Sequence, residues 1–233
     1  MTIKLVESAT EPLRQATSQT SFVYARLRSD ILMGRYAPSE RLKISELAES
    51  LDVSPGAVRE ALSRLAPEQL VVPRDQKGFI VAPLSVEDLE DLTDLRCEVE
   101  AIALGRSVER GGGDWEAAVL GAAHRLRRTT SRNGADRALT TDWIELHAAF
   151  HAALIGACGS RRLKDLHGQL YQQSERYRGL SAHIETGRDV AAEHQALVDA
   201  ALDRDSARLV ELAVGHLRET TALIINAARL TPD

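Results

Sequence analysis

A chain of 233 residues, 44% hydrophobic and 27% charged, is long enough for two small globular domains and has the composition of a water-soluble protein. Its two cysteines, Cys97 and Cys158, exclude a small fold built on disulfides and indicate the reducing cytoplasm. No run approaches the ~18 apolar residues of a membrane helix, and the N-terminus lacks the apolar core of a signal peptide, so we expect a cytoplasmic protein without membrane contact.

The net charge of −5 is unevenly distributed along the chain. Residues 19–83 contain nine Lys and Arg against eight Asp and Glu, whereas residues 84–233 contain 18 basic and 24 acidic residues. A surplus of a single positive charge is a weak electrostatic indication of DNA binding. DNA binding must therefore be argued from the pattern of residues in this segment.

The first 18 residues are polar without a period and are predicted to be a flexible tail. Apolar residues then recur at helical spacing over residues 22–33, and Gly34 ends that helix. A short helix is predicted at 44–51, and Ser54 with Pro55 begins a third helix. The β-prone runs 70–72 and 79–81 flank a polar turn and predict a hairpin. The order of helix, short helix, helix and hairpin is typical of a winged helix-turn-helix domain, which we place at residues 19–83.

Residues 84–233 are predicted to form an antiparallel all-helical bundle of about six helices, so the chain as a whole is mostly α-helical. Apolar periods and breaks predict helices at 85–110, 114–130, 141–158, 161–181, 187–203 and 205–229. The apolar stripe of the first of these is expected to contain Leu89, Leu92, Leu95, Val99 and Ile102.

The segment 54–65 has the two faces that a DNA recognition helix requires, with apolar residues on one side and polar residues at the end that enters the major groove. Arg59 can reach a guanine edge or a phosphate from there. Taken singly, these residues fit a plain surface helix equally well. Their occurrence together, in the element order of a winged helix-turn-helix, favours DNA binding. The expected contacts to double-stranded DNA are Arg35, Lys43, Ser54, Gly56, Arg59, Arg64, Lys77 and Gly78.

Several runs within residues 19–83 resemble the GntR family of bacterial regulators: Ile31-Leu32-Met33-Gly34-Arg35, Val58-Arg59-Glu60-Ala61-Leu62 and Gly78-Phe79. The continuation is similar to the FCD ligand-binding domain of the FadR-type branch, through Leu95-Arg96, Phe150-His151, Glu193-His194 and His216-Leu217. The family often has Arg where Ser45 and Pro55 stand, and this departure prevents an operator sequence from being carried over.

The runs 81–89 and 170–178 most resemble CsiR-type repressors of glutarate and related dicarboxylate catabolism. This resemblance implies a repressor released by a small carboxylate. A helix-turn-helix reader is expected to bind a two-fold operator as a homodimer.

Four of the seven histidines have a spacing that suits a metal site. His147 and His151 share one helix face, while His194 and His216 belong to two other predicted helices. On spacing alone, four separate polar histidines are the better interpretation. The resemblance reverses this, because many FadR-type ligand domains bind a divalent ion through Asp-x-x-x-His and two later histidines. His147 takes the Asp position, which favours Zn²⁺, or Ni²⁺, over Mn²⁺.

Arg96 is the candidate anchor for an effector carboxylate. A guanidinium near a bundle interior needs an anion, and both Glu100, one turn away, and an effector carboxylate satisfy this requirement. Tyr177 is also predicted to bind the effector, and Arg176, Arg178 and His183 are further candidates for the same cavity.

Three functions remain at this point: a ligand-responsive regulator, a regulator that senses the metal itself, and a metal-dependent enzyme. The enzyme is disfavoured because Glu193, next to His194, points about 100° away from it on the helix and leaves no evident general base. We therefore expect a regulator without enzymatic activity.

Overall fold

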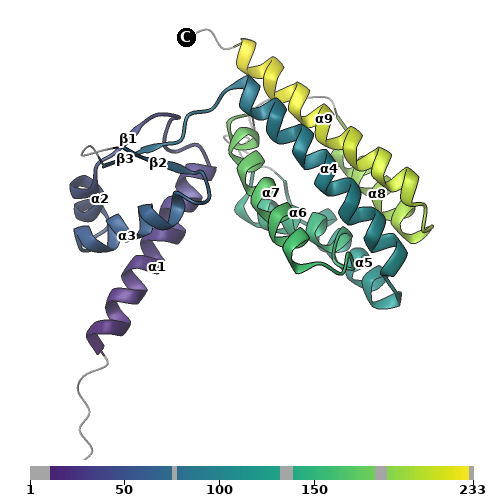
Figure 1. Cartoon of the computed structure of the whole chain (residues 1–233), viewed down its shortest axis with the longest axis horizontal. Coiled ribbons are helices and arrows are strands. Elements are labelled where there is room, and N and C mark those ends of the chain that lie inside the picture. The colour runs from purple at the N-terminus through teal and green to yellow at the C-terminus, as the bar shows by residue number, and fades with distance from the viewer. Residues whose placement is uncertain (1–10, 75–77, 132–138, 182–187, 231–233) are drawn as a thin grey trace, which may run out of the picture. The chain divides into compact units, whose positions relative to one another are not determined.

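The computed structural model describes residues 11–74, 78–131, 139–181 and 188–230. Contacts between Cα atoms divide the chain into two compact units, with the division between Pro83 and Leu84 (Figure 1). The first unit contains three helices and a small sheet among its described residues, and the second contains helices only. The predicted fold class, mostly α-helical with an N-terminal winged helix-turn-helix, is confirmed.

The first unit has the element order of a winged helix-turn-helix. Its elements are α1 (Glu11–Leu32), β1 (Arg41–Leu42), α2 (Ile44–Ser50), α3 (Pro55–Leu65), β2 (Val71–Arg74) and β3 (Gly78–Val81). The strands form one antiparallel sheet in the order β1-β3-β2. Strand β1 has two residues, too few for an alternating pattern, and it was not predicted from the sequence.

Helix α1 begins at Glu11, inside the segment 1–18 that the sequence predicts to be a flexible tail. The prediction is wrong for residues 11–18, since Glu, Leu, Arg, Gln and Ala favour a helix without any apolar period. Residues 1–10 lie outside the described part of the chain.

The core of this unit joins α1 to α3. Val23, Leu27 and Ile31 of α1 are buried against a cluster that includes Val58 and Leu62 of α3. Helix α3 begins where its sequence predicts, because the Ser54 hydroxyl accepts a hydrogen bond from the backbone N–H of Ala57 and Pro55 occupies the first turn. Packing of its apolar face leaves the opposite face in solvent.

The second unit is a bundle of helices that brings distant segments together around one interior. Its elements are α4 (Val86–Arg110), α5 (Gly113–Arg127), α6 (Thr141–Leu154), α7 (Arg161–Ser181), α8 (Val190–Leu202) and α9 (Ser206–Leu230). Helices α4 and α9 run side by side and antiparallel, and α7 packs against both (Figure 1). No helix in the described ranges combines the length and apolar character that a bilayer crossing requires.

The buried face of α4 is more polar than its sequence suggests. Leu95 and Ile102, expected in the apolar stripe, are 43% and 49% exposed. The stripe instead passes through Arg96, Glu100 and Ala103, which are buried. These positions continue the three- and four-residue steps from Leu89, whereas Leu95 and Ile102 lie one position, about 100°, away. A charged stripe inside a bundle is the first structural indication of a site.

Candidate metal and effector site

Four histidines from three helices meet in the interior of the second unit. His147 and His151 lie one turn apart on α6, His194 lies on α8 and His216 on α9, and all four are buried. One ring nitrogen of each lies within 4.8 Å of those of the others. The Nε2 atoms of His147 and His151 are 3.3 Å apart, which is about the spacing of two nitrogens on a tetrahedral zinc ion with Zn–N of ~2.0–2.1 Å.

The environment keeps three of these rings, those of His147, His151 and His194, neutral. Burial, together with the Arg178 guanidinium, holds the pKa of His147 well below its usual range, and burial with neighbouring histidines does the same for His151. Burial also lowers the pKa of His194 to about 3. Neutral imidazole is the form that binds a metal ion.

Hydrogen bonds on the outer side of two rings leave their other nitrogens for an ion. The Nδ1 of His216 lies 2.8 Å from Oε2 of Glu193, and the Nδ1 of His147 lies 2.6 Å from the Tyr171 hydroxyl. Metal-binding histidines usually have such an outer partner. The Nε2 of His194 is buried and has no hydrogen-bond partner within the described ranges. These residues therefore fit a divalent ion that prefers nitrogen.

Glu193 has a role that its position in the sequence did not suggest. It points away from His194, as expected, but toward His216 on the neighbouring helix, and Arg188 binds both of its carboxylate oxygens at 2.5 Å. Although burial raises the pKa of this carboxyl, the hydrogen bonds from His216 and Arg188 lower it to about 2. Glu193 is thus an ionised acceptor that orients a ring.

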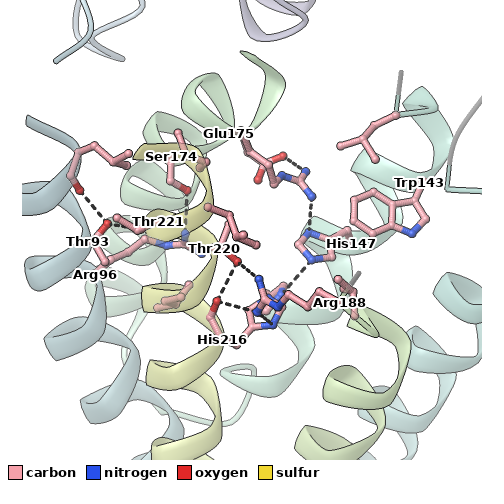
Figure 2. Close-up of a pocket in the computed structure, with 18 residues that line it drawn as sticks. Thr93, Arg96, Trp143, His147, Ser174, Glu175, Arg188, His216, Thr220 and Thr221 are labelled. Carbon is pink, nitrogen blue, oxygen red and sulfur yellow. Dashed lines mark hydrogen bonds and ion pairs between the residues drawn. The ribbon is translucent and has the colours of Figure 1, made fainter. Parts of the chain in front are cut away.

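A cavity of about 150 Å³ opens beside the histidines (Figure 2). Figure 2 shows side chains from several helices that point into it. Its lining includes three arginines, three of the histidines and several hydroxyls: Arg96, Arg178, Arg188, His147, His151, His216, Thr93, Ser174, Thr220 and Thr221. A cavity with this lining suits a small anion.

Of the three arginines that line this cavity, Arg96 is the one without an ion pair to a carboxylate of the described residues. It is 9% exposed, its Nη1 donates to Ser174 Oγ at 2.7 Å, and its Nε has no partner in the described part of the chain. Glu100, the internal partner considered from the sequence, lies 2.8 Å from Nε2 of His167. Burial raises the pKa of this carboxyl, but the hydrogen bond with His167 and the nearby Arg96 guanidinium lower it, so Arg96 and Glu100 interact without a direct ion pair. Arg178 and Arg188 each pair with a glutamate, Glu175 and Glu193.

The structure does not bring Tyr177 to the cavity. Tyr177 is buried, and its hydroxyl donates to Asp88 of α4, away from the lining residues. The reason is the helical period, since Ser174, Glu175 and Arg178 occupy the inner face of α7 and Tyr177 the face toward the start of α4. Of the further candidates, Arg178 lines the cavity and Arg176 does not. His183 lies outside the described residues.

The residues expected to contact DNA differ in how free their side chains are. Arg59 is exposed on α3, and its guanidinium makes no ion pair or hydrogen bond within the described ranges. Arg35 pairs with Asp30, Lys43 with Glu46, and Arg64 lies over the ring of Tyr24.

The remaining expected contacts are backbone or loop positions. Ser54 caps α3, Gly56 lies exposed in its first turn, and Gly78 begins β3 with a φ of +85°. Lys77 lies outside the described residues. Arg41 and Arg74, on β1 and β2, are exposed as well, although they are not among the DNA contacts expected from the sequence.

Comparison with known proteins gives the family. Residues 19–81 match the bacterial regulatory proteins of the gntR family, and residues 91–219 match the FCD domain. The chain belongs to the GntR family. It is a transcriptional regulator with a DNA-binding helix-turn-helix and an FCD domain, as the resemblance implied, and its family is not one of enzymes.

Named GntR relatives cover most of the chain. An uncharacterised HTH-type transcriptional regulator, BphR of Paraburkholderia xenovorans LB400, is 40% identical over 215 residues, 91% of this chain and 88% of BphR. The HTH-type transcriptional repressor GlaR of Escherichia coli K12 is 36% identical over 209 residues, 88% of this chain and 94% of GlaR.

Solved structures show the same fold. A putative GntR regulator from Rhodococcus sp. RHA1 has a TM-score of 0.72 at 24% identity, covering 90% of this chain and 99% of that one. McbR/YncC of Escherichia coli has a TM-score of 0.72 at 19% identity, covering 90% and 98%.

Proposed function

We propose that this GntR-type regulator is a cytoplasmic repressor that binds its operator as a homodimer and is released when a small dicarboxylate enters the cavity of the FCD domain. The observation that carries the proposal is the buried Arg96, which makes no ion pair with a carboxylate in the described part of the chain and lies in the same cavity as His147, His151 and His216. The repressor named GlaR, 36% identical to this chain, supports the sign of regulation.

The charges in the cavity favour a dianion. Arg178 and Arg188 are balanced by Glu175 and Glu193, and the low pKa values of His147, His151 and His194 keep these rings neutral. A divalent ion held by the four histidines would supply a Lewis-acidic centre for one carboxylate oxygen. Arg96 then adds a positive charge with a planar donor face that matches a second carboxylate. Four imidazole nitrogen ligands favour Zn²⁺, or Ni²⁺, over Mn²⁺.

Release of DNA requires that the ligand favour one arrangement of the dimer over another. Helix α4 carries Arg96 and Thr93, and it follows β3 of the helix-turn-helix after four residues, 82–85. The Thr93 hydroxyl lies 2.7 Å from that of Thr221 on α9, and both residues line the cavity. An occupant of the cavity can therefore change how α4 packs on α9, and α4 is the covalent route to the DNA-binding unit.

The test is operator affinity measured by fluorescence anisotropy, on an operator first selected from random duplexes with the wild-type protein. Glutarate, the dicarboxylate that the CsiR-type resemblance implies, should weaken binding by the Zn²⁺-loaded wild type roughly 5- to 150-fold, as for a coupling of ~1–3 kcal/mol. Arg96→Ala should retain the operator at the same glutarate concentration. Arg106→Ala, an exposed arginine on the same helix, should respond like the wild type.

Two outcomes contradict the proposal. Equal release of wild type and Arg96→Ala would show that Arg96 is not the anchor. Release by Zn²⁺ alone, with glutarate adding nothing, would show that the ion is the effector. The closed set of four histidines favours this metal sensor as the second candidate.

A further inference from the structure

Tyr171 on α7 contacts both halves of the proposed site. Its hydroxyl lies 2.6 Å from Nδ1 of His147, and its ring lies beneath the guanidinium of Arg96, with Cζ 5.0 Å from the ring centre. The side chain is buried, with 6% of the residue exposed. A metal-binding histidine and the candidate anion anchor therefore share one neighbour.

The backbone turn that follows Tyr171 holds Arg96 as well. Ser174 accepts a hydrogen bond from Nη1 of Arg96 at 2.7 Å, and its hydroxyl donates to the carbonyl oxygen of Tyr171 at 2.8 Å. His167, one turn earlier, stacks on the Tyr171 ring at 6.2 Å and lies 2.8 Å from the buried Glu100. Because these contacts come from residues of both α4 and α7, the Tyr171 ring has little freedom to move.

The hydroxyl of Tyr171 is the nearer of two polar groups at Nδ1 of His147, at 2.6 Å, while Nη1 of Arg178 lies 3.4 Å from the same nitrogen. Trp143 stacks on the His147 ring at 4.5 Å with an interplanar angle of 16°. Stacking fixes the plane of the ring but allows a half-turn that exchanges its two edges. A hydrogen bond at Nδ1 distinguishes the edges and directs Nε2 to the other histidines.

We propose that Tyr171 is a positioning residue that couples the two ligands: its hydroxyl directs Nε2 of His147 to the metal, and its ring face holds Arg96 for the anion. This inference rests on the proposed function. Any rotation of Tyr171 disturbs both contacts, so metal occupancy and anion affinity depend on one side chain. Such a shared neighbour is a physical route for cooperative binding of ion and effector.

The first test measures Zn²⁺ affinity by competition with a chromophoric chelator, on untagged protein without any organic acid. Tyr171→Phe keeps the ring and removes the hydroxyl, and should weaken Zn²⁺ binding roughly 10- to 100-fold, the usual effect of losing an outer partner of a ligand. The matched control is Tyr177→Phe, because Tyr177 is a buried tyrosine on the same helix whose hydroxyl donates a hydrogen bond to Asp88. The Zn²⁺ affinity of this variant should equal that of the wild type.

A double-mutant cycle separates positioning from a general loss of structure. If Tyr171 acts through His147, Tyr171→Phe should weaken Zn²⁺ binding no further in a His147→Ala background. Equal and additive losses in both backgrounds would overturn the proposal, as would equal affinities of wild type and Tyr171→Phe. Absence of Zn²⁺ binding by the wild type would overturn the metal site itself.

The second test concerns the ring face, with glutarate as the probe and all proteins saturated with Zn²⁺. Tyr171→Phe should bind glutarate within about 2-fold of the wild type, because its aromatic face remains. Tyr171→Leu should bind it roughly 2- to 30-fold more weakly, the range expected for losing a cation–π contact. Equal glutarate affinities of the Phe and Leu variants would overturn the coupling, because the ring would then not hold Arg96 for the anion.

Discussion

His194 shows how burial prepares a single side chain for its role. It is 8% exposed on α8, and its Nε2 has no hydrogen-bond partner within the described ranges. Burial lowers its pKa to about 3, so the ring is neutral at pH 7. The same burial penalises folding in acid, because the unfolded chain binds a proton that the folded protein excludes.

Metal-free protein should therefore lose stability as the pH falls below about 6.5, the usual pKa of histidine in an unfolded chain. With a folded pKa of about 3, His194 alone accounts for about 1.4 kcal/mol between pH 7.5 and pH 5.5. Urea unfolding at the two pH values measures this loss, and His194→Gln should reduce it by that amount. His124→Gln, an exposed histidine on α5, should leave the loss unchanged; an equal effect of both substitutions would contradict the explanation by burial.

At the scale of an element, helix α3 carries an exposed cation, Arg59, on the face that we expect to contact DNA. Its inner face packs through Val58, Ala61, Leu62 and Leu65, which are fully buried, and this packing fixes the direction of the outer face. Among the residues that the structure describes, Arg59 on that outer face makes no ion pair, unlike Arg35 and Lys43. Contact with a base or phosphate thus requires no ion pair to be broken.

Arg59→Ala should weaken specific operator binding by ~1–3 kcal/mol, the usual effect of losing a good base contact. Footprinting on the selected operator measures it. Arg161→Ala, a fully exposed arginine at the start of α7, is the matched control and should protect the operator at the wild-type concentration. Protection by Arg59→Ala at that same concentration would show that α3 does not read DNA through this residue.

For the whole molecule, we expect two chains to bind one operator. A helix-turn-helix unit covers one half-site, so a two-fold dimer matches half-sites about one helical turn, ~10 base pairs, apart. Sedimentation velocity should give a complex of two chains per duplex. Lengthening the spacer by about half a turn, ~5 base pairs, should abolish high-affinity binding because the second half-site then faces away. One chain per operator at saturation, or indifference to the spacer, would argue against a dimeric reader.

The sequence by itself determined the kinds of elements, their order and the residues with metal-binding potential. Helical periods, the Ser54-Pro55 cap and the breaks at glycine are local signals, and local signals decide where helices begin and end. This is why the winged helix-turn-helix, the helical bundle and the pairing of His147 with His151 were predicted correctly as patterns. Runs similar to the GntR family then indicated a regulator.

Only the tertiary structure decided which side chains meet, because contacts between remote helices depend on how each helix is rotated in the bundle. The buried face of α4 is shifted by one position from the expected stripe, so Arg96 and Glu100 face the interior of the bundle and Leu95 faces solvent. Tyr177 was selected from the sequence, but Tyr171 is the tyrosine that contacts His147. Glu193 was dismissed because it points away from His194, yet packing of α8 on α9 turns it toward His216. No local period encodes these rotations, since they result from the fit of all the helices at once.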